Sequence, residues 1–162
     1  MRHGQADLLS AAVREDRERA LTGHGRREVV QRARDMAPFW VNVQIFCSPY
    51  LRARQTAEEV AAILGHRPFQ VEDFLQPEMD PEIILGAFAE LEVGLRVPTD
   101  KQHPADLLII SHMPLVSRLC AWWVQADTQV HYPLSTAGVH ELEINAAQLL
   151  LPGQAHWVRT YT

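Results

Sequence analysis

The apolar run Leu107–Ile110 is the feature that most restricts how this chain can fold. A strand with one side in water alternates apolar and polar residues, whereas these four residues are all apolar. Such a strand is typical of a parallel sheet that helices cover on both faces. The strand is predicted over 106–111, and Pro114, a residue suited to the first turn of a helix, begins a helix that runs to about Val124.

Strand and helix patterns alternate through the rest of the chain. Apolar residues at three- and four-residue spacing predict helices, and short apolar or alternating runs predict strands. This alternation predicts a three-layer α/β/α sandwich with a mostly parallel sheet, and 162 residues fit a single domain over 1–162. An alternating tail over 138–162 adds an antiparallel edge hairpin with its turn near Pro152. The predicted helices cover 22–38, 49–64 and 82–95, the other strands 41–47 and 69–71, with a surface loop over 5–20 and a linker over 98–104.

Several side chains are predicted to be buried between these elements. Trp122 and Trp123 are expected to pack in the core. Cys47 and Cys120 lie far apart in sequence and form no CxxC pair, so they are expected to be reduced, buried thiols. The helix over 82–95 is expected to bury one stripe of residues, namely Ile83, Ile84, Ala87, Phe88 and Leu91.

Composition excludes several classes of protein. The formal net charge of −5 argues against a nucleic-acid binder, which would carry a basic stripe. No apolar run approaches the roughly 18 residues of a membrane span, and a charged segment rather than a signal peptide follows Met1. A cytoplasmic protein without a membrane partner is therefore expected. The eight histidines include no HExxH pattern and no paired cysteines, so no metal site and no cofactor are predicted.

The triplet Arg2-His3-Gly4 stands at the start of the chain. A triplet of this kind would normally follow a strand of several apolar residues, and here Met1 alone precedes it. The expected first strand is therefore either truncated or very short. Its length matters because a central strand of the sheet would fix the position of His3.

Four basic side chains follow predicted strand ends. Arg2 and His3 follow the first segment, Arg52 lies in the first turn of the helix after the strand over 41–47, and His112 follows the strand over 106–111. In parallel sheets ligands bind beyond the carboxyl ends of the strands, so these four side chains are expected to converge. Arginine forks match phosphate oxygens, and histidine titrates near neutrality, so the set points to an oxyanion ligand.

Phosphoryl transfer is the reaction that this set predicts. His3 attacks phosphorus, Arg2, Arg52 and His112 hold the oxygens, and water then hydrolyses the phosphohistidine. Because these groups already supply positive charge, no metal is needed. A serine hydrolase is disfavoured because the chain has no Gly-x-Ser-x-Gly elbow.

Four motifs follow one another along the chain, namely Arg2-His3-Gly4 with Ala6, Leu21-Thr22-x-x-Gly25, Ser48-Pro49-x-x-Arg52-Ala-x-Gln55-Thr56 and Ile110-Ser111-His112-x-Pro114-Leu115-Val116. Together they resemble the histidine phosphatase (phosphoglycerate-mutase-like) superfamily, and the compact chain resembles its SixA-type phosphohistidine phosphatase branch. The resemblance implies that His3 is the nucleophile, that Arg2 and Arg52 clamp phosphate, and that His112 is the second histidine of the phosphate pocket. Met113, next to His112, is placed with the predicted substrate-binding residues.

The chain also departs from this family. Position 5 is Gln where the compact branch usually has an acid, and the long insertions that form a lid in larger relatives are absent. An open, shallow site is therefore expected, which suits a phosphate displayed on a protein. Glu78 and Asp80 lie in a predicted loop and are the candidates for the general acid.

Three functions follow as alternatives. The first is a phosphatase acting on a phosphorylated protein, such as a histidine-phosphotransfer domain. The second is a phosphatase for small phosphoesters, and the third is a phosphate-binding pseudoenzyme without turnover.

Overall fold

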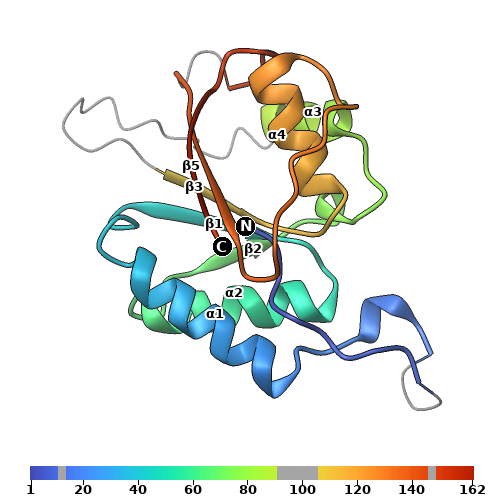
Figure 1. Ribbon diagram of the computed structural model, residues 1–162, viewed down its shortest axis with the longest axis vertical. Helices are drawn as coiled ribbons and strands as arrows, with labels where there is room; N and C mark the ends of the chain where they lie inside the picture. The colour runs from blue at the N-terminus through green and yellow to red at the C-terminus, as the bar shows by residue number, and fades with distance from the viewer. Residues whose placement is uncertain (11–13, 91–105, 146–148) are drawn as a thin grey trace.

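The computed structural model describes residues 1–10, 14–90, 106–145 and 149–162 (Figure 1). Its central strand is β1 (Val43–Cys47), which pairs in parallel with β2 (Phe69–Val71) on one side and β3 (Asp106–Ile110) on the other. A separate antiparallel pair, β4 (Val139–Glu143) and β5 (His156–Tyr161), forms the predicted hairpin. The mostly parallel sheet and the antiparallel hairpin are thus confirmed, although the hairpin forms a two-stranded sheet of its own.

Residues 1–3 connect the parallel strands to the hairpin. The Ser111 amide donates to the Met1 carbonyl (3.1 Å), and the His3 amide donates to the Ser111 carbonyl (3.0 Å). On the other side, the Arg2 amide donates to the Gly138 carbonyl (3.0 Å). In the part of the chain that the structure describes, the regular pairing of this first segment is a single parallel bridge between Arg2 and Ser111, the residue after β3. This bridge holds His3 beside the end of β3.

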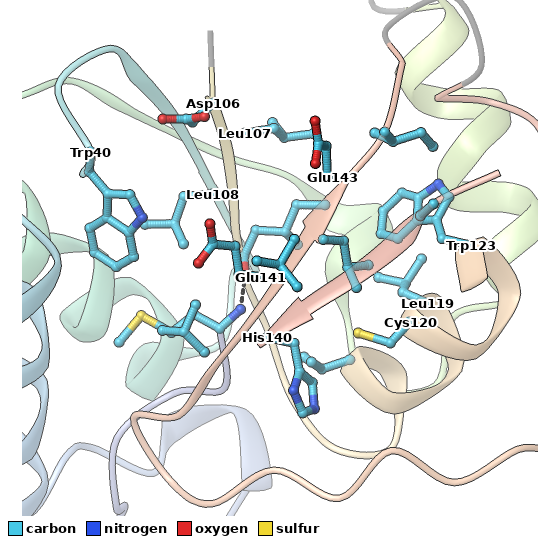
Figure 2. A pocket seen from close by; sticks show the side chains of 18 of the residues that line it. Trp40, Asp106, Leu107, Leu108, Leu119, Cys120, Trp123, His140, Glu141 and Glu143 are labelled. Atoms are coloured by element: carbon cyan, nitrogen blue, oxygen red, sulfur yellow. Dashed lines mark hydrogen bonds between the residues drawn. The ribbon is translucent and has the colours of Figure 1, made fainter. Parts of the chain in front are cut away.

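An apolar groove of about 670 Å³ is bordered by Met1, β3 and β4 (Figure 2). The residues that line it include Leu107 and Leu108 of β3, Leu119 of the helix α4 (Leu115–Gln125) and Leu142 of β4. Met1 also lines this groove, and its amine donates to the carbonyl of Ile109 (2.8 Å). The described lining includes no histidine or arginine of the predicted phosphate site, so this groove is separate from that site.

Helices cover both faces of the parallel sheet, as predicted (Figure 1). One layer consists of α1 (Gly23–Met36) and α2 (Leu51–Ile63), and the other of α3 (Pro81–Glu90) and α4 (Leu115–Gln125). Successive residues of β1 pack on opposite faces of the sheet. Ile45 is part of the core under α1 and α2, and Phe46 is part of the core under α3 and α4.

The buried residues agree with most of the predictions. Trp122 and Trp123 are buried in the α3–α4 layer, and Cys47 and Cys120 are buried free thiols. Ile83, however, is 55% exposed, so its predicted burial is wrong. It lies about 100° around the helix from Ile84, and Ile84, Leu85 and Phe88 already form the face that meets the core. Leu91, which was also predicted to be buried, lies outside the described residues. The same is true of the rest of that predicted helix and of the linker predicted over 98–104.

Two predicted boundaries were too early. Val41 is 70% exposed in a turn, and β1 begins at Val43. The second helix begins at Leu51 rather than Pro49, with Tyr50 as its N-cap. The loop over 5–20 contains a short 3₁₀ turn, η1 (Asp16–Glu18), and another, η2 (Asp73–Leu75), precedes α3. No helix in the described part of the chain is long and apolar enough to span a membrane.

Candidate active site

The ends of the parallel strands bring His3, Arg52 and His112 together. The Nε of Arg52 donates to Nε2 of His3 at 3.2 Å. The rings of His3 and His112 lie 5.0 Å apart, centroid to centroid. All three side chains are buried. The predicted convergence of these three residues is thus seen in the structure, although they are separated by more than a hundred positions of sequence.

His3 is held with one nitrogen free of a proton. Its Nδ1 lies 2.7 Å from the carbonyl oxygen of Gly4, so Nδ1 carries the proton and donates. Nε2 therefore keeps a lone pair, which accepts from Arg52. Burial, followed by the charges of Arg52 and Arg2, lowers the pKa of His3 to about 4. At neutral pH the ring is a neutral base with Nε2 available for attack.

Two glycines explain how the backbone around His3 is fixed. Gly4 lies so close to α1 that a Cβ there would come within 2.7 Å of the Gly25 carbonyl oxygen. A Cβ on Gly25 would be 2.0 Å from the carbonyl oxygen of Gln5. Thr22 caps α1 by accepting from the amide of Gly25 (2.9 Å). The Leu21-Thr22-x-x-Gly25 motif thus lets the first turn of α1 pack against the segment that follows His3.

Two residues of α2, Gln55 and Thr56, hold the same part of the chain through hydrogen bonds. The buried hydroxyl of Thr56 accepts from the amide of Gly4 (3.2 Å) and donates to the carbonyl of Arg52 (2.7 Å). Gln55 accepts from the amide of Leu21 (2.7 Å). These contacts give the Gln55-Thr56 end of the third motif a structural role that sequence reasoning did not assign.

His112 is the second buried imidazole. Its Nε2 lies 2.7 Å from the hydroxyl of Ser48, and its ring packs edge-on against Tyr50 with centroids 5.0 Å apart. Within the described part of the chain, its buried Nδ1 has no hydrogen-bond partner. Burial, then the neighbouring His3 and Arg52, lowers the pKa of His112 to about 2. His112 is therefore also neutral at pH 7 and presents an unused ring nitrogen to a ligand.

Arg2 precedes His3 in the short first segment, where it forms the parallel bridge to Ser111. Its Nη1 donates to the carbonyl of Leu134 (2.8 Å). Its buried Nε has no partner among the described residues. The charge of Arg2 still lowers the pKa of both His3 and His112, so it contributes to the positive potential of the site. No hydrogen bond joins it to the other three residues in the described structure.

The two candidates for the general acid lie in different surroundings. Asp80 pairs with Arg118 (3.1 Å) and accepts from the amide of Glu82 at the start of α3 (3.0 Å). Glu78 is exposed and lies against Tyr50, whose pKa is raised by burial and then by the charge of Glu78. Because Tyr50 packs on His112, Glu78 is connected to the histidines through Tyr50.

Met113, the remaining predicted substrate-binding residue, is half-buried. It packs against a small apolar cluster of Val116, Cys120 and Leu134.

Two residues that the sequence analysis did not single out, Tyr50 and Asp16, also border the site. The guanidinium of Arg52 lies over the ring of Tyr50, 5.0 Å from its centroid. Asp16 of η1 forms a salt bridge with Arg52 (2.8 Å). Tyr50 could have been suspected from its position inside the Ser48–Thr56 motif. Asp16 could not, because it is one of several charged residues in a loop without periodicity.

No group of three or more His, Cys, Asp or Glu side chains that could hold a metal ion occurs in the described residues. The positive charge near His3 and His112 comes instead from the guanidinium groups of Arg52 and Arg2. Arginine and histidine donors are suited to an oxyanion such as phosphate.

Comparison with known proteins identifies a family and two similar proteins. A profile of the histidine phosphatase superfamily (branch 1) matches residues 1–93. Phosphohistidine phosphatase SixA of Escherichia coli K12 is 36% identical over 129 residues, which cover 79% of this chain and 74% of that protein. An uncharacterised protein of Picosynechococcus sp. (strain ATCC 27264 / PCC 7002 / PR-6) is 35% identical over 159 residues, covering 96% of this chain and 87% of the relative.

Solved structures extend the similarity to the fold. The histidine phosphatase SixA complexed with tungstate superposes with a TM-score of 0.76 at 26% identity, covering 99% of this chain and 92% of the other. A mycobacterial glucosyl-3-phosphoglycerate phosphatase has a TM-score of 0.73 at 15% identity, covering 97% and 94%, and this likeness shows the fold alone.

The chain belongs to the histidine phosphatase superfamily, as its four motifs predicted. It is an enzyme, a metal-independent phosphatase. Among the proteins described above, it is similar over most of its length to SixA.

Proposed function

We propose that this phosphatase removes the phosphoryl group from phosphohistidine on a protein, through a covalent phosphohistidine intermediate on His3. The observation that carries the proposal is the state of His3. Its Nε2 is unprotonated and buried, and it is held 3.2 Å from the guanidinium of Arg52. A nucleophile and an oxyanion donor are thus adjacent before substrate arrives.

In the first step, Nε2 of His3 attacks phosphorus and the bond from phosphorus to the substrate nitrogen breaks. Arg52 and Arg2 supply charge to the phosphoryl oxygens, and the free ring nitrogen of His112 contacts them. The leaving imidazole takes up a proton as it departs. Glu78 is our choice of proton donor, because Asp80 is engaged by Arg118.

In the second step, water attacks the phosphorus of phosphorylated His3. The bond between phosphorus and Nε2 breaks, the electron pair returns to the ring, and inorganic phosphate leaves. The low pKa of His3 helps here, because the regenerated ring stays neutral and ready for another attack.

A protein substrate is supported by the similarity to SixA, whose name gives phosphohistidine as its substrate. The sequence also lacks the long insertions that would form a lid over a small molecule. The partner we propose is a phosphorylated protein such as a histidine-phosphotransfer domain. The buried, reduced thiols of Cys47 and Cys120 fit a cytoplasmic enzyme, which is part of the proposal.

The test is a hydrolysis assay on a phosphohistidine-bearing protein and on an aryl phosphate. The wild-type enzyme should prefer the protein, and His3→Ala should lower kcat/KM by about 10³-fold or more. His66→Ala, which removes an exposed histidine, is the matched control. Preference for the aryl phosphate would move the enzyme to the small-phosphoester class. Full turnover in His3→Ala would refute the covalent route, and phosphate binding without turnover would indicate a pseudoenzyme.

A further inference from the structure

The guanidinium of Arg52 is occupied by the chain itself. Its Nη2 donates to the Asp16 carboxylate (2.8 Å), and its Nη1 donates to the Asp16 backbone carbonyl (2.6 Å). The third nitrogen, Nε, donates to His3. The two terminal nitrogens of this guanidinium, Nη1 and Nη2, could otherwise bind two phosphate oxygens. In this structure both donate to oxygens of Asp16 instead.

Asp16 is itself placed between two arginines. Its other carboxylate oxygen accepts from Nη1 of Arg19 (2.7 Å). Arg19 also donates through Nε to the carbonyl of Asp7, which ties it to the segment after His3. The Asp16 carboxylate therefore resembles a bound anion, contacted on both oxygens by guanidinium groups.

Polar contacts hold this carboxylate in place. The turn η1 (Asp16–Glu18) has no buried residue. The side chain of Asp16 is 46% exposed, whereas that of Arg52 is 5% exposed. Because the carboxylate side of this ion pair is open to solvent, the pair contributes little net stability, and an incoming dianion can replace it.

We propose that Asp16 is an internal competitor for phosphate: it occupies the Arg52 fork in the empty site and is displaced when a phosphoryl group binds. Asp16 thereby lowers the affinity of the site for substrate and for product phosphate alike. The inference rests on the proposed phosphate site. Binding requires the state in which Asp16 has left the fork, so the apparent affinity is reduced by the fraction of molecules in that state.

Calorimetric titration with inorganic phosphate tests this displacement. Asp16→Asn removes the charge but keeps the shape of the side chain, and it should bind phosphate about fivefold more tightly than the wild-type protein. Glu18→Gln is the matched control, because Glu18 lies in the same turn with the same charge but makes no ion pair with Arg52 in the described structure. It should stay close to the wild-type affinity.

Hydrogen exchange gives a second readout that does not depend on a variant. The amides of Glu18 and Arg19 donate to the carbonyls of Glu15 and Asp16 within the turn. Saturating phosphate should speed exchange at these amides in the wild-type protein, because the turn loses its tie to Arg52.

Three outcomes would overturn the inference: unchanged or weaker phosphate binding by Asp16→Asn, equal tightening by Glu18→Gln, or slower exchange in η1 with phosphate. Weaker binding would mean that Asp16 positions Arg52 for the ligand instead of competing with it. If the wild-type enzyme hydrolyses phosphohistidine while any of these results is found, the inference fails and the proposed function stands. If phosphate binds and displaces η1 but no substrate is hydrolysed, the proposed function fails and the inference stands.

Discussion

His3 combines properties that a nucleophilic imidazole needs but that cost stability. Burial and two nearby guanidinium groups disfavour its protonated form, and the Gly4 carbonyl fixes the proton on Nδ1. The same burial keeps His112 neutral. Each ring therefore resists protonation in the folded enzyme, whereas in the unfolded chain it takes up a proton near pH 6.5.

This difference predicts how stability depends on pH. As the pH falls from 6.5 to 4, the unfolded chain gains protons at both rings while the folded enzyme does not, so the free energy of unfolding should fall. Each histidine contributes about 1.4 kcal/mol per pH unit in this window. Chemical denaturation at a series of pH values should show a shallower slope in His3→Asn, by about that amount.

The control for this series is His66→Asn, which replaces an exposed histidine. A slope in His3→Asn equal to that of the wild-type protein would show that His3 titrates alike in the folded and unfolded states. The account of a neutral nucleophile would then be wrong.

The contact between α1 and the segment after His3 is the element on which the geometry of the site depends. It requires the backbone of Gln5 to touch the first turn of α1, which leaves no room for a side chain at Gly25. The capping hydroxyl of Thr22 and the support from Thr56 complete this contact.

Gly25→Ala should therefore destabilise the protein by about 3 kcal/mol or more, because the new methyl group meets backbone atoms that cannot rotate away. Gly86→Ala provides the matched control, since a Cβ at Gly86 in α3 meets nothing within 4 Å. Ala is the better helix former, so that change should be neutral or stabilising by up to about 1 kcal/mol. Thermal unfolding of both variants checks the contrast, and equal effects would refute the close contact.

Elements with a strong pattern were predictable from the sequence. The run Leu107–Ile110 predicted β3, in which Leu108 and Ile110 are buried and Leu107 and Ile109 are half-buried, and the helix predicted from Thr22 is α1, which Thr22 caps. Patterns failed where tertiary contacts decide: apolar Val41 lies in an exposed turn, and Ile83 is apolar but faces solvent. Hydrophobicity alone cannot choose which of two adjacent apolar residues faces the core.

In the molecule as a whole, the site forms where separate chain segments end at one edge of the sheet. His3, Arg52 and His112 were predictable because each follows a strand end, and that rule of parallel sheets is independent of sequence detail. Asp16 was not predictable, because its contact with Arg52 depends on how an irregular loop returns over α2. The same holds for Arg2, whose guanidinium donates to the carbonyl of Leu134, a residue 132 positions further along the chain.

The most direct test of the account is to trap the phosphorylated enzyme. The wild-type protein would be mixed with a radiolabelled phosphohistidine protein, quenched in base to preserve phosphohistidine, and mapped by peptide mass spectrometry. The account predicts transient label on His3 and none in His3→Ala. Label on His112, or steady hydrolysis without any labelled enzyme, would contradict the assignment of His3 as the nucleophile.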